Sequence, residues 1–297
     1  MRLKPFTLKA ALLLFSVSAI FSSGCGPDDP KEDALPPVDS TQTTILNVNG
    51  EIFSIPSPIQ TAFLIKNSGA AYNKDILNPA SKSSQYSTNF SKALNLGIYG
   101  ADLGYVTIYD QTQDAIGYLN GAKKLADELG VSGAFDAKTL ENFQKNLGNK
   151  DSMLAMVGVA YRSSDSYLKN NDRSDVSGLV LAGGWIESLY FATNVYKTKP
   201  NEDVKHRIAE QKSSLQSLIK LLTPFYSQPE YTEFIDNLND LSTVFDGVEF
   251  QYKYEKPTTD ADKKITTINS KTEVKITPEQ IESISQKIKS IRAQVVG

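Results

Sequence analysis

The chain has 297 residues, with 31 Lys and Arg, 34 Asp and Glu, one His and one Cys. Its net charge of −3 provides no excess of basic side chains to neutralise phosphates, so nucleic acid is not an expected partner. A single cysteine and a single histidine exclude an intramolecular disulfide and a Cys/His metal cluster, and we expect no metal and no cofactor.

Residues 1–24 have the pattern of a secretory signal peptide. Arg2, Lys4 and Lys9 precede the apolar run AALLLFSVSAIF at 10–21, and small residues follow it. The run is too short to span a bilayer, which takes about 20 apolar residues. We therefore expect the protein to be exported.

Cys25 follows Ser22-Ser23-Gly24, and this tetrapeptide resembles the lipobox of bacterial lipoproteins. Ser22 stands where the consensus prefers Leu, a departure that resembles the relaxed lipoboxes of Bacteroidetes. The resemblance implies that Cys25 becomes the N-terminus and carries the lipid. Several acyl chains hold a protein firmly on a membrane. The alternatives for an odd exported cysteine are an intermolecular disulfide or an exposed reactive thiol.

Residues 25–42 are predicted to be a lipidated cysteine followed by a disordered tether. They contain four Pro, few apolar residues and an acidic excess, so they cannot bury enough surface to order themselves. Gly26 is not the Asp that retains enteric-type lipoproteins at the inner membrane. The run from Asp28 to Asp33 resembles the acidic export signal of surface-exposed Bacteroidetes lipoproteins. We expect an outer-membrane location, facing the cell surface or the periplasm.

The sequence TTILNVNGEIFSI at 43–55 predicts a β-hairpin. Asn49-Gly50 lies between two short β-prone runs and suits a type I′ turn, in which both central residues have positive φ. From 56 to about 246 the pattern predicts helices. We therefore expect an all-α fold with a helical domain at 43–255, arranged as an antiparallel helical bundle or as stacked helical hairpins.

Three helices are visible from apolar residues at steps of three and four. They are predicted over 152–168, 203–225 and 230–245. Pro229 suits the first turn of the last of these helices.

The C-terminal part, 256–297, is predicted to contain a linker, a possible strand and a helix. The alternation in VEFQYKYE at 248–255 indicates a strand, KPTTDADKK at 256–264 a polar linker, and ITTINSKTEVKI a possible returning strand. Thr277, Pro278 and Gln280 form a capping box for a final helix. Its isoleucine stripe predicts docking on the body, with pairing to another chain as the alternative.

Two predicted helices, 90–110 and 178–196, contain repeated glycines. Glycine inside a helix costs about 1 kcal/mol relative to alanine, so its repetition needs a reason. Small residues at helical spacing allow two helix backbones to approach closely. We predict that these two helices are core and pack near one another.

Glu187 lies in an almost entirely apolar segment, and a buried carboxylate must be paired or protonated. Arg162 and Arg173 are its expected partners in an internal ion pair. The functional alternative is a polar cluster within the bundle that joins Glu187 to Asp102 and Asp110, with Tyr105 or Tyr190 as possible members. Glu-x-x-His motifs, which build di-metal sites in helical bundles, are absent from the sequence.

No catalytic residue is predicted. His206 lies between Lys205 and Arg207 on a charged helix face, which favours a solvated side chain over a general base. The sequence has no G-x-S-x-G nucleophile motif and no glycine-rich phosphate loop.

Residues 55–295 resemble a group of helical Bacteroidetes lipoproteins. The stretches that carry the resemblance are IPSPIQ, ALNLGIYGADLGY, NKDSML and GGWIESLYFAT. The resemblance implies a helical lipoprotein body and no particular activity.

The first functional hypothesis is a membrane-anchored envelope lipoprotein that binds a small ligand or a protein partner. One alternative is an envelope hydrolase that uses buried carboxylates around Glu187 and Asp102. The other is a structural component of the envelope.

Overall fold

The computed structural model describes most of the chain from residue 44 onward. The described residues are 44–48, 51–55, 57–131, 141–143, 145–146, 149, 151–156, 158 and 173–297. Residues 1–43, on which the signal-peptide, lipidation and tether predictions depend, lie outside these ranges. Every described residue belongs to one unit, formed by 35–297.

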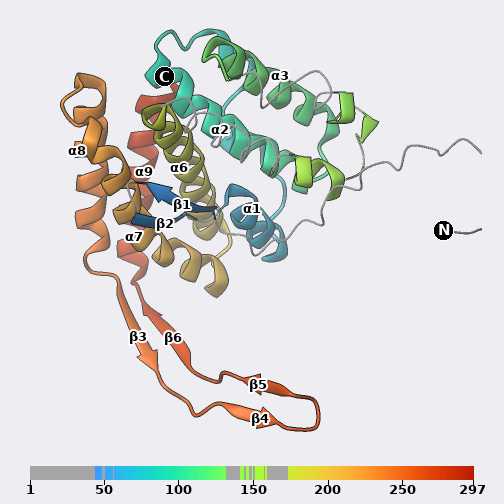
Figure 1. Cartoon of the computed structure of the whole chain (residues 1–297), viewed down its shortest axis with the longest axis vertical. Helices are drawn as coiled ribbons and strands as arrows, with labels where there is room; N and C mark the ends of the chain where they lie inside the picture. The colour runs from blue at the N-terminus through green and yellow to red at the C-terminus, as the bar shows by residue number, and fades with distance from the viewer. Residues whose placement is uncertain are drawn as a thin grey trace, which may run out of the picture. The chain divides into compact units, whose positions relative to one another are not determined.

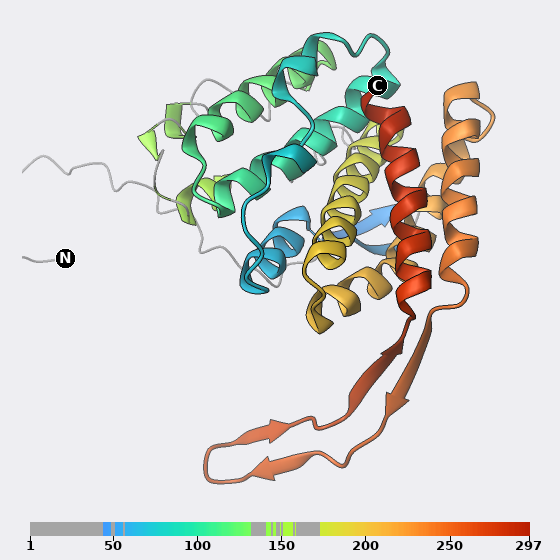
Figure 2. The ribbon, with the colours of Figure 1, turned by 180° about the vertical axis from the view of Figure 1, so that it is seen from behind.

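The described part of the chain is predominantly helical, as predicted (Figures 1 and 2). Of the helices described, none combines the length and the apolar character that crossing a bilayer requires. The longer helices are α1 (Pro58–Asn67), α2 (Asn89–Ile108), α3 (Thr112–Glu128), α6 (Ser174–Thr198), α7 (Glu202–Leu222), α8 (Pro229–Phe245) and α9 (Pro278–Val296). Short 3₁₀ helices are η1 (Lys74–Ile76), η2 (Ala80–Ser84) and η4 (Thr223–Phe225).

Helices α2 and α6 carry the repeated glycines and pack directly against each other. A Cβ atom on Gly97 would overlap the carbonyl oxygen of Val180 in α6. A Cβ atom on Gly183 would in turn overlap the carbonyl oxygen of Leu94 in α2. The prediction that these helices pack near one another is confirmed, and glycine is required because each backbone occupies the space that a side chain would need.

Helix α6 is buried along most of its length, from Val176 to Val195. Helices α1, α2, α7 and α9 all contact it. A helix that is apolar on all sides is stable only when neighbours cover it, which explains the nearly uniform apolar sequence of this segment.

Helices α8 and α9 bury one face each, at the positions that their periodicity indicates. Helix α9 packs against α6 and α8. It begins with the predicted capping box, in which the Thr277 amide donates to Gln280 Oε1 at 2.8 Å and the Gln280 amide donates to Thr277 Oγ1 at 3.2 Å. The buried positions are Tyr231, Phe234, Ile235, Leu238, Leu241 and Phe245 in α8, and Ile281, Ile284, Ile288, Ile291 and Val296 in α9.

The predicted N-terminal hairpin is present. Strands β1 (Thr44–Val48) and β2 (Glu51–Ile55) are antiparallel, with Val48 opposite Glu51. The turn residues 49–50 lie outside the described ranges. Strand β2 also contacts α7.

A second hairpin precedes α9, and it is longer than predicted. The expectation of a polar linker at 256–264 is wrong in part, because Thr258 and Thr259 are β-branched and favour extended backbone. Lys264, at φ 55, lies in the turn that follows them. The strands are β3 (Glu249–Lys253), which pairs with β6 (Lys271–Lys275), and β4 (Thr258–Asp260), which pairs with β5 (Ile265–Thr267), both antiparallel.

The segment between α1 and α2 departs from the predicted run of helix. Gly69, at φ 75, follows the end of α1, and only η1 and η2 interrupt the irregular backbone that leads to α2. Buried amides hold this segment in place. The Asn78 side-chain NH₂ donates to the Tyr86 hydroxyl at 2.9 Å and to Asn95 Oδ1 of α2 at 3.1 Å.

Candidate functional site

Asp102 and Glu187 lie in the interface between α2 and α6, and neither side chain has any solvent-exposed surface. The sequence placed both in a candidate polar cluster. The structure brings them close enough for the charge of one to act on the protonation of the other. What surrounds them decides whether the cluster is a pocket or an internal ion pair.

Arg292 of helix α9 forms a bidentate ion pair with Glu187. The Arg292 Nε atom donates to Glu187 Oε2 at 2.5 Å, and its Nη2 atom donates to Oε1 at 2.6 Å. The same Nη2 atom donates to the carbonyl oxygen of Ile76 at 3.0 Å. The guanidinium also lies over the Tyr190 ring, with 4.3 Å from its carbon to the ring centroid. Paired hydrogen bonds of this kind are the strong form of an Arg–carboxylate contact.

The expected partners of Glu187 were Arg162 and Arg173, and the structure assigns that role to Arg292 instead. Arg162 lies outside the described residues. Arg173 is the residue before the first turn of α6, roughly 20 Å along the helix axis from Glu187, which is too far for an ion pair. The one available signal for Arg292 is its place next to Ile291, at the edge of the isoleucine stripe that α9 buries.

Asp110 does not belong to the buried cluster. Helix α2 ends at Ile108, and Asp110 follows in a left-handed conformation at φ 59, with its side chain 64 % exposed. Its carboxylate pairs with Lys66 Nζ at 3.1 Å. The inclusion of Asp110 in the cluster was therefore wrong, because the end of the helix turns that side chain to solvent.

Asp102 has no cation of its own. Both of its carboxylate oxygens are buried and have no hydrogen-bond partner among the described residues. Burial, together with the negative charge of Glu187, raises the pKa of Asp102 well above its ordinary value. A protonated Asp102 gains an O–H that it can donate to Glu187, so the carboxylic acid is the form that satisfies this site.

Burial also raises the pKa of Glu187, but the Arg292 guanidinium opposes this shift. Glu187 is therefore the more readily ionised of the two acids, and Asp102 holds the proton. The cluster then contains one carboxylate, one guanidinium and one neutral acid, and it carries no net charge. This arrangement is an internal ion pair that fixes α9 against α6.

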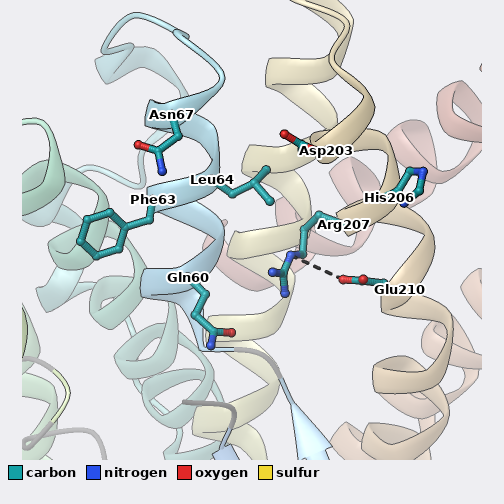
Figure 3. Close-up of a pocket in the computed structure, with 8 residues that line it drawn as sticks. All are labelled: Gln60, Phe63, Leu64, Asn67, Asp203, His206, Arg207 and Glu210. Carbon is teal, nitrogen blue, oxygen red and sulfur yellow. Dashed lines mark ion pairs between the residues drawn. The ribbon is translucent and has the colours of Figure 1, made fainter. Parts of the chain in front are cut away.

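The accessible polar groups lie elsewhere, in a cleft of about 460 Å³ between α1 and α7 (Figure 3). Each helix contributes four side chains at the spacing i, i+3, i+4 and i+7, so two helix faces line the cleft from opposite sides. They are Gln60, Phe63, Leu64 and Asn67 from α1, and Asp203, His206, Arg207 and Glu210 from α7.

Arg207 is the one lining residue of this cleft with a buried, unsatisfied donor. Its Nε atom is 3.7 Å from Glu210 Oε2, a distance at which the two charges attract without a hydrogen bond. That Nε atom has no hydrogen-bond partner within the described part of the chain. His206 is partly exposed beside it, as its charged helix face predicts. The cleft offers the exposed part of the Arg207 side chain, two carboxylates and two amides to a bound molecule.

Two further pockets lie along α8, and neither of them nor the α1–α7 cleft is lined by Asp102 or Glu187. Within the described ranges, no group of three His, Cys, Asp or Glu side chains could hold a metal ion. Comparison with protein-family models, with curated proteins and with solved structures gives no match to this chain.

Proposed function

We propose that the protein is a lipid-anchored lipoprotein of the outer membrane that acts by binding a small ligand or a partner protein. The signal-peptide pattern and the lipobox-like sequence that ends at Cys25 support the anchor. One observation favours binding over catalysis. The polar side chains of the α1–α7 cleft reach solvent, whereas the two acids that a hydrolase would use have no exposed surface.

The helical part is proposed to be an antiparallel bundle. The connection from α6 to α7 and the connection from α7 to α8 are short, and each of these helix pairs is in contact. Short connections favour antiparallel neighbours. Helix α9 then adds to the same group through its contacts with α6 and α8.

The α1–α7 cleft is the proposed ligand site. Its apolar contacts come from Phe63 and Leu64, and its charges of both signs come from Arg207, Asp203 and Glu210. A short peptide, which carries donors, acceptors and apolar side chains together, has the chemistry that such a lining fits. Arg207 supplies the positive charge of the cleft, and its side chain is 21 % exposed, so a peptide carboxylate or carbonyl can approach the guanidinium.

The anchor is tested by the intact mass of protein purified from native membranes. The proposal expects a chain that begins at Cys25 and carries acyl groups. It also expects Cys25→Ser to move the protein from the membrane fraction to the soluble fraction. An uncleaved leader or an unmodified thiol would refute the anchor.

The ligand site is tested by pull-down of the full-length protein from detergent-solubilised membranes, with mass spectrometry of bound peptides and proteins. Arg207→Gln should abolish the recovery of the bound species. Lys220→Gln, which removes a charge from an exposed position of the same helix, should leave recovery unchanged. Equal recovery with both variants would remove the cleft from the proposal.

The hydrolase alternative requires a substrate to reach Glu187 and Asp102. Arg292 occupies both oxygens of Glu187, and neither acid has exposed surface. This geometry supports the binding proposal over that alternative. The structural-component alternative predicts abundant stoichiometric association through the C-terminal helix, and assembly that is unaffected by deletion of 277–297 would remove its support.

A further inference from the structure

The hairpin between α8 and α9, residues 249–275, extends away from the helices in both views (Figures 1 and 2). We call it the β-arm. Its strand residues are all exposed except Val274, which is partly buried. Phe250, Tyr252 and Tyr254 are exposed to 40 %, 66 % and 70 %.

The base of the β-arm has one aromatic face and one charged face. Phe250 is opposite Val274 and Tyr252 is opposite Thr272, so these four side chains share a face because strand side chains alternate. The other face carries Glu249, Gln251 and Lys253 on β3, opposite Lys275, Glu273 and Lys271 on β6. Lys253 pairs with Glu273 across the two strands.

A two-stranded hairpin is marginally stable in water, and three or more strands with a covered apolar face are needed for independent stability. Each strand of the β-arm base also has an outer edge of backbone donors and acceptors that its hairpin partner does not use. An aromatic face that is 40–66 % exposed at Phe250 and Tyr252 adds apolar surface that a further strand would cover. These properties indicate that the β-arm is an incomplete sheet, which a third strand from a partner would stabilise.

We propose that the partner strand is β3 of a second copy of this chain, paired antiparallel about Gln251. In this register Gln251 lies opposite its own counterpart. Glu249 lies opposite Lys253 of the second copy, and Phe250 lies opposite Tyr252 of that copy. Each of these pairs occurs twice because of the two-fold symmetry. The sequence EFQYK is thus complementary to itself in charge and in apolar character.

The outer edge of β6 lacks this complementarity. Two copies of KTEVK paired about Glu273 would place Lys271 opposite Lys275 and Glu273 opposite Glu273. Like charges directly opposite each other are destabilising. The charges therefore select β3 as the self-pairing edge. The product is a four-stranded sheet with the order β6-β3-β3-β6, with the aromatic residues of both copies on one face.

This inference is independent of the proposed ligand site, and a pair of cysteine variants in the full-length chain tests it. Gln251→Cys places a thiol at the proposed two-fold axis. Glu273→Cys is the matched control, because it places a thiol on β6 directly opposite position 251 of the same arm. Oxidation in intact cells should convert Gln251→Cys to a disulfide-linked dimer and leave Glu273→Cys monomeric. The unsubstituted chain, with Cys25 as its only cysteine, gives the background.

Charge variants combined with Gln251→Cys test the register. Glu249→Lys alone places Lys opposite Lys at both charge pairs, and Lys253→Glu alone places Glu opposite Glu, so each should lose the cross-linked homodimer. Co-expression of the two, with one carrying an affinity tag, should restore a tagged–untagged dimer, because each Lys now meets a Glu. Each variant also disturbs a contact within its own arm, and co-expression does not repair that contact. A restored dimer would therefore show that the loss came from repulsion between the two copies and not from misfolding of the β-arm.

Three results would overturn the proposal. The first is no dimer with Gln251→Cys, and the second is equal dimer formation with Glu273→Cys. The third is a cross-link from Gln251→Cys to a different protein, which would assign the β-arm to another partner. Loss of peptide binding in Arg207→Gln with the Gln251→Cys dimer unchanged would separate the β-arm from the α1–α7 cleft.

Discussion

Replacement of Asp102 by Asn should make the free energy of unfolding less dependent on pH. Asp102 is fully buried beside Glu187, and its pKa is raised well above the ordinary value of 3.8. Asn has nearly the same shape, cannot ionise, and can donate its amide N–H to Glu187 as the protonated acid does. The substitution therefore removes the proton equilibrium at this position and retains a group that can donate to Glu187.

The sign follows from the raised pKa. The folded wild type holds a proton on Asp102 in a pH range where the unfolded chain, with the ordinary pKa of 3.8, has released it. Stability therefore falls as pH rises through this range, by about 1.4 kcal/mol per pH unit for one proton. The stabilisation that the bound proton provides is fully present below the pKa of the unfolded chain. The difference between wild type and variant should therefore grow with each pH unit in this range, and each unit is a sizeable share of a typical domain stability of about 5–15 kcal/mol.

Urea denaturation at pH 4.5, 5.5, 6.5 and 7.5 measures this difference. Asp102→Asn should gain stability relative to wild type at each step upward, until the pH passes the folded pKa of Asp102 and the difference becomes constant. Asp262→Asn, at an exposed position of the β-arm, is the control and should follow the wild-type profile. Parallel profiles for wild type and Asp102→Asn would show that Asp102 is ionised in the folded protein and would refute the proton assignment.

Three further predictions concern the helices, and chemical denaturation tests each of them. Arg292→Met leaves Glu187 buried without its cation and should lower the free energy of unfolding by about 3–5 kcal/mol. Addition of Glu187→Leu should recover most of that loss, and no recovery would contradict the ion pair. Gly183→Ala should destabilise the protein by about 1–3 kcal/mol or more, because the new methyl group overlaps the Leu94 carbonyl oxygen. An unchanged denaturation midpoint would contradict the close approach of α2 and α6. Gly117→Ala should instead stabilise by about 0.5–1 kcal/mol, because its nearest neighbouring atom would be 3.7 Å away and alanine is the better helix former; a loss would refute this.

Most helices could be predicted because their signals are local. The apolar steps of α8 and α9 and the capping box at Thr277 each involve residues within one or two turns of the chain. The expectation of helix from 56 to 246 failed at η1 and η2, where Gly69 and Pro79 lie in an irregular segment. There the Asn78 side chain is held by a residue of another element, Asn95 of α2, and local patterns do not reveal such a contact.

The candidate site was predicted only in part, for a related reason. The apolar surroundings of Glu187 correctly indicated a buried acid that needs a partner. Its partner Arg292 lies 105 residues away in sequence, and nothing near Glu187 specifies it. Asp110 was misplaced because the prediction extended α2 beyond Ile108. The α1–α7 cleft was not predicted at all, because its two helix faces form a cleft only when the fold places them opposite each other.

The sequence alone determined most of the helices, the strand pattern of β3, and the small residues that α2 and α6 carry at helical spacing. Those properties depend on residues a few positions apart, whose preferences act before any long-range contact forms. Only the tertiary structure decided that Arg292 neutralises Glu187, that Asp102 lacks a cation, and that the β-arm stands exposed. Each of these depends on which distant surfaces meet, and therefore on the packing of the whole helical body.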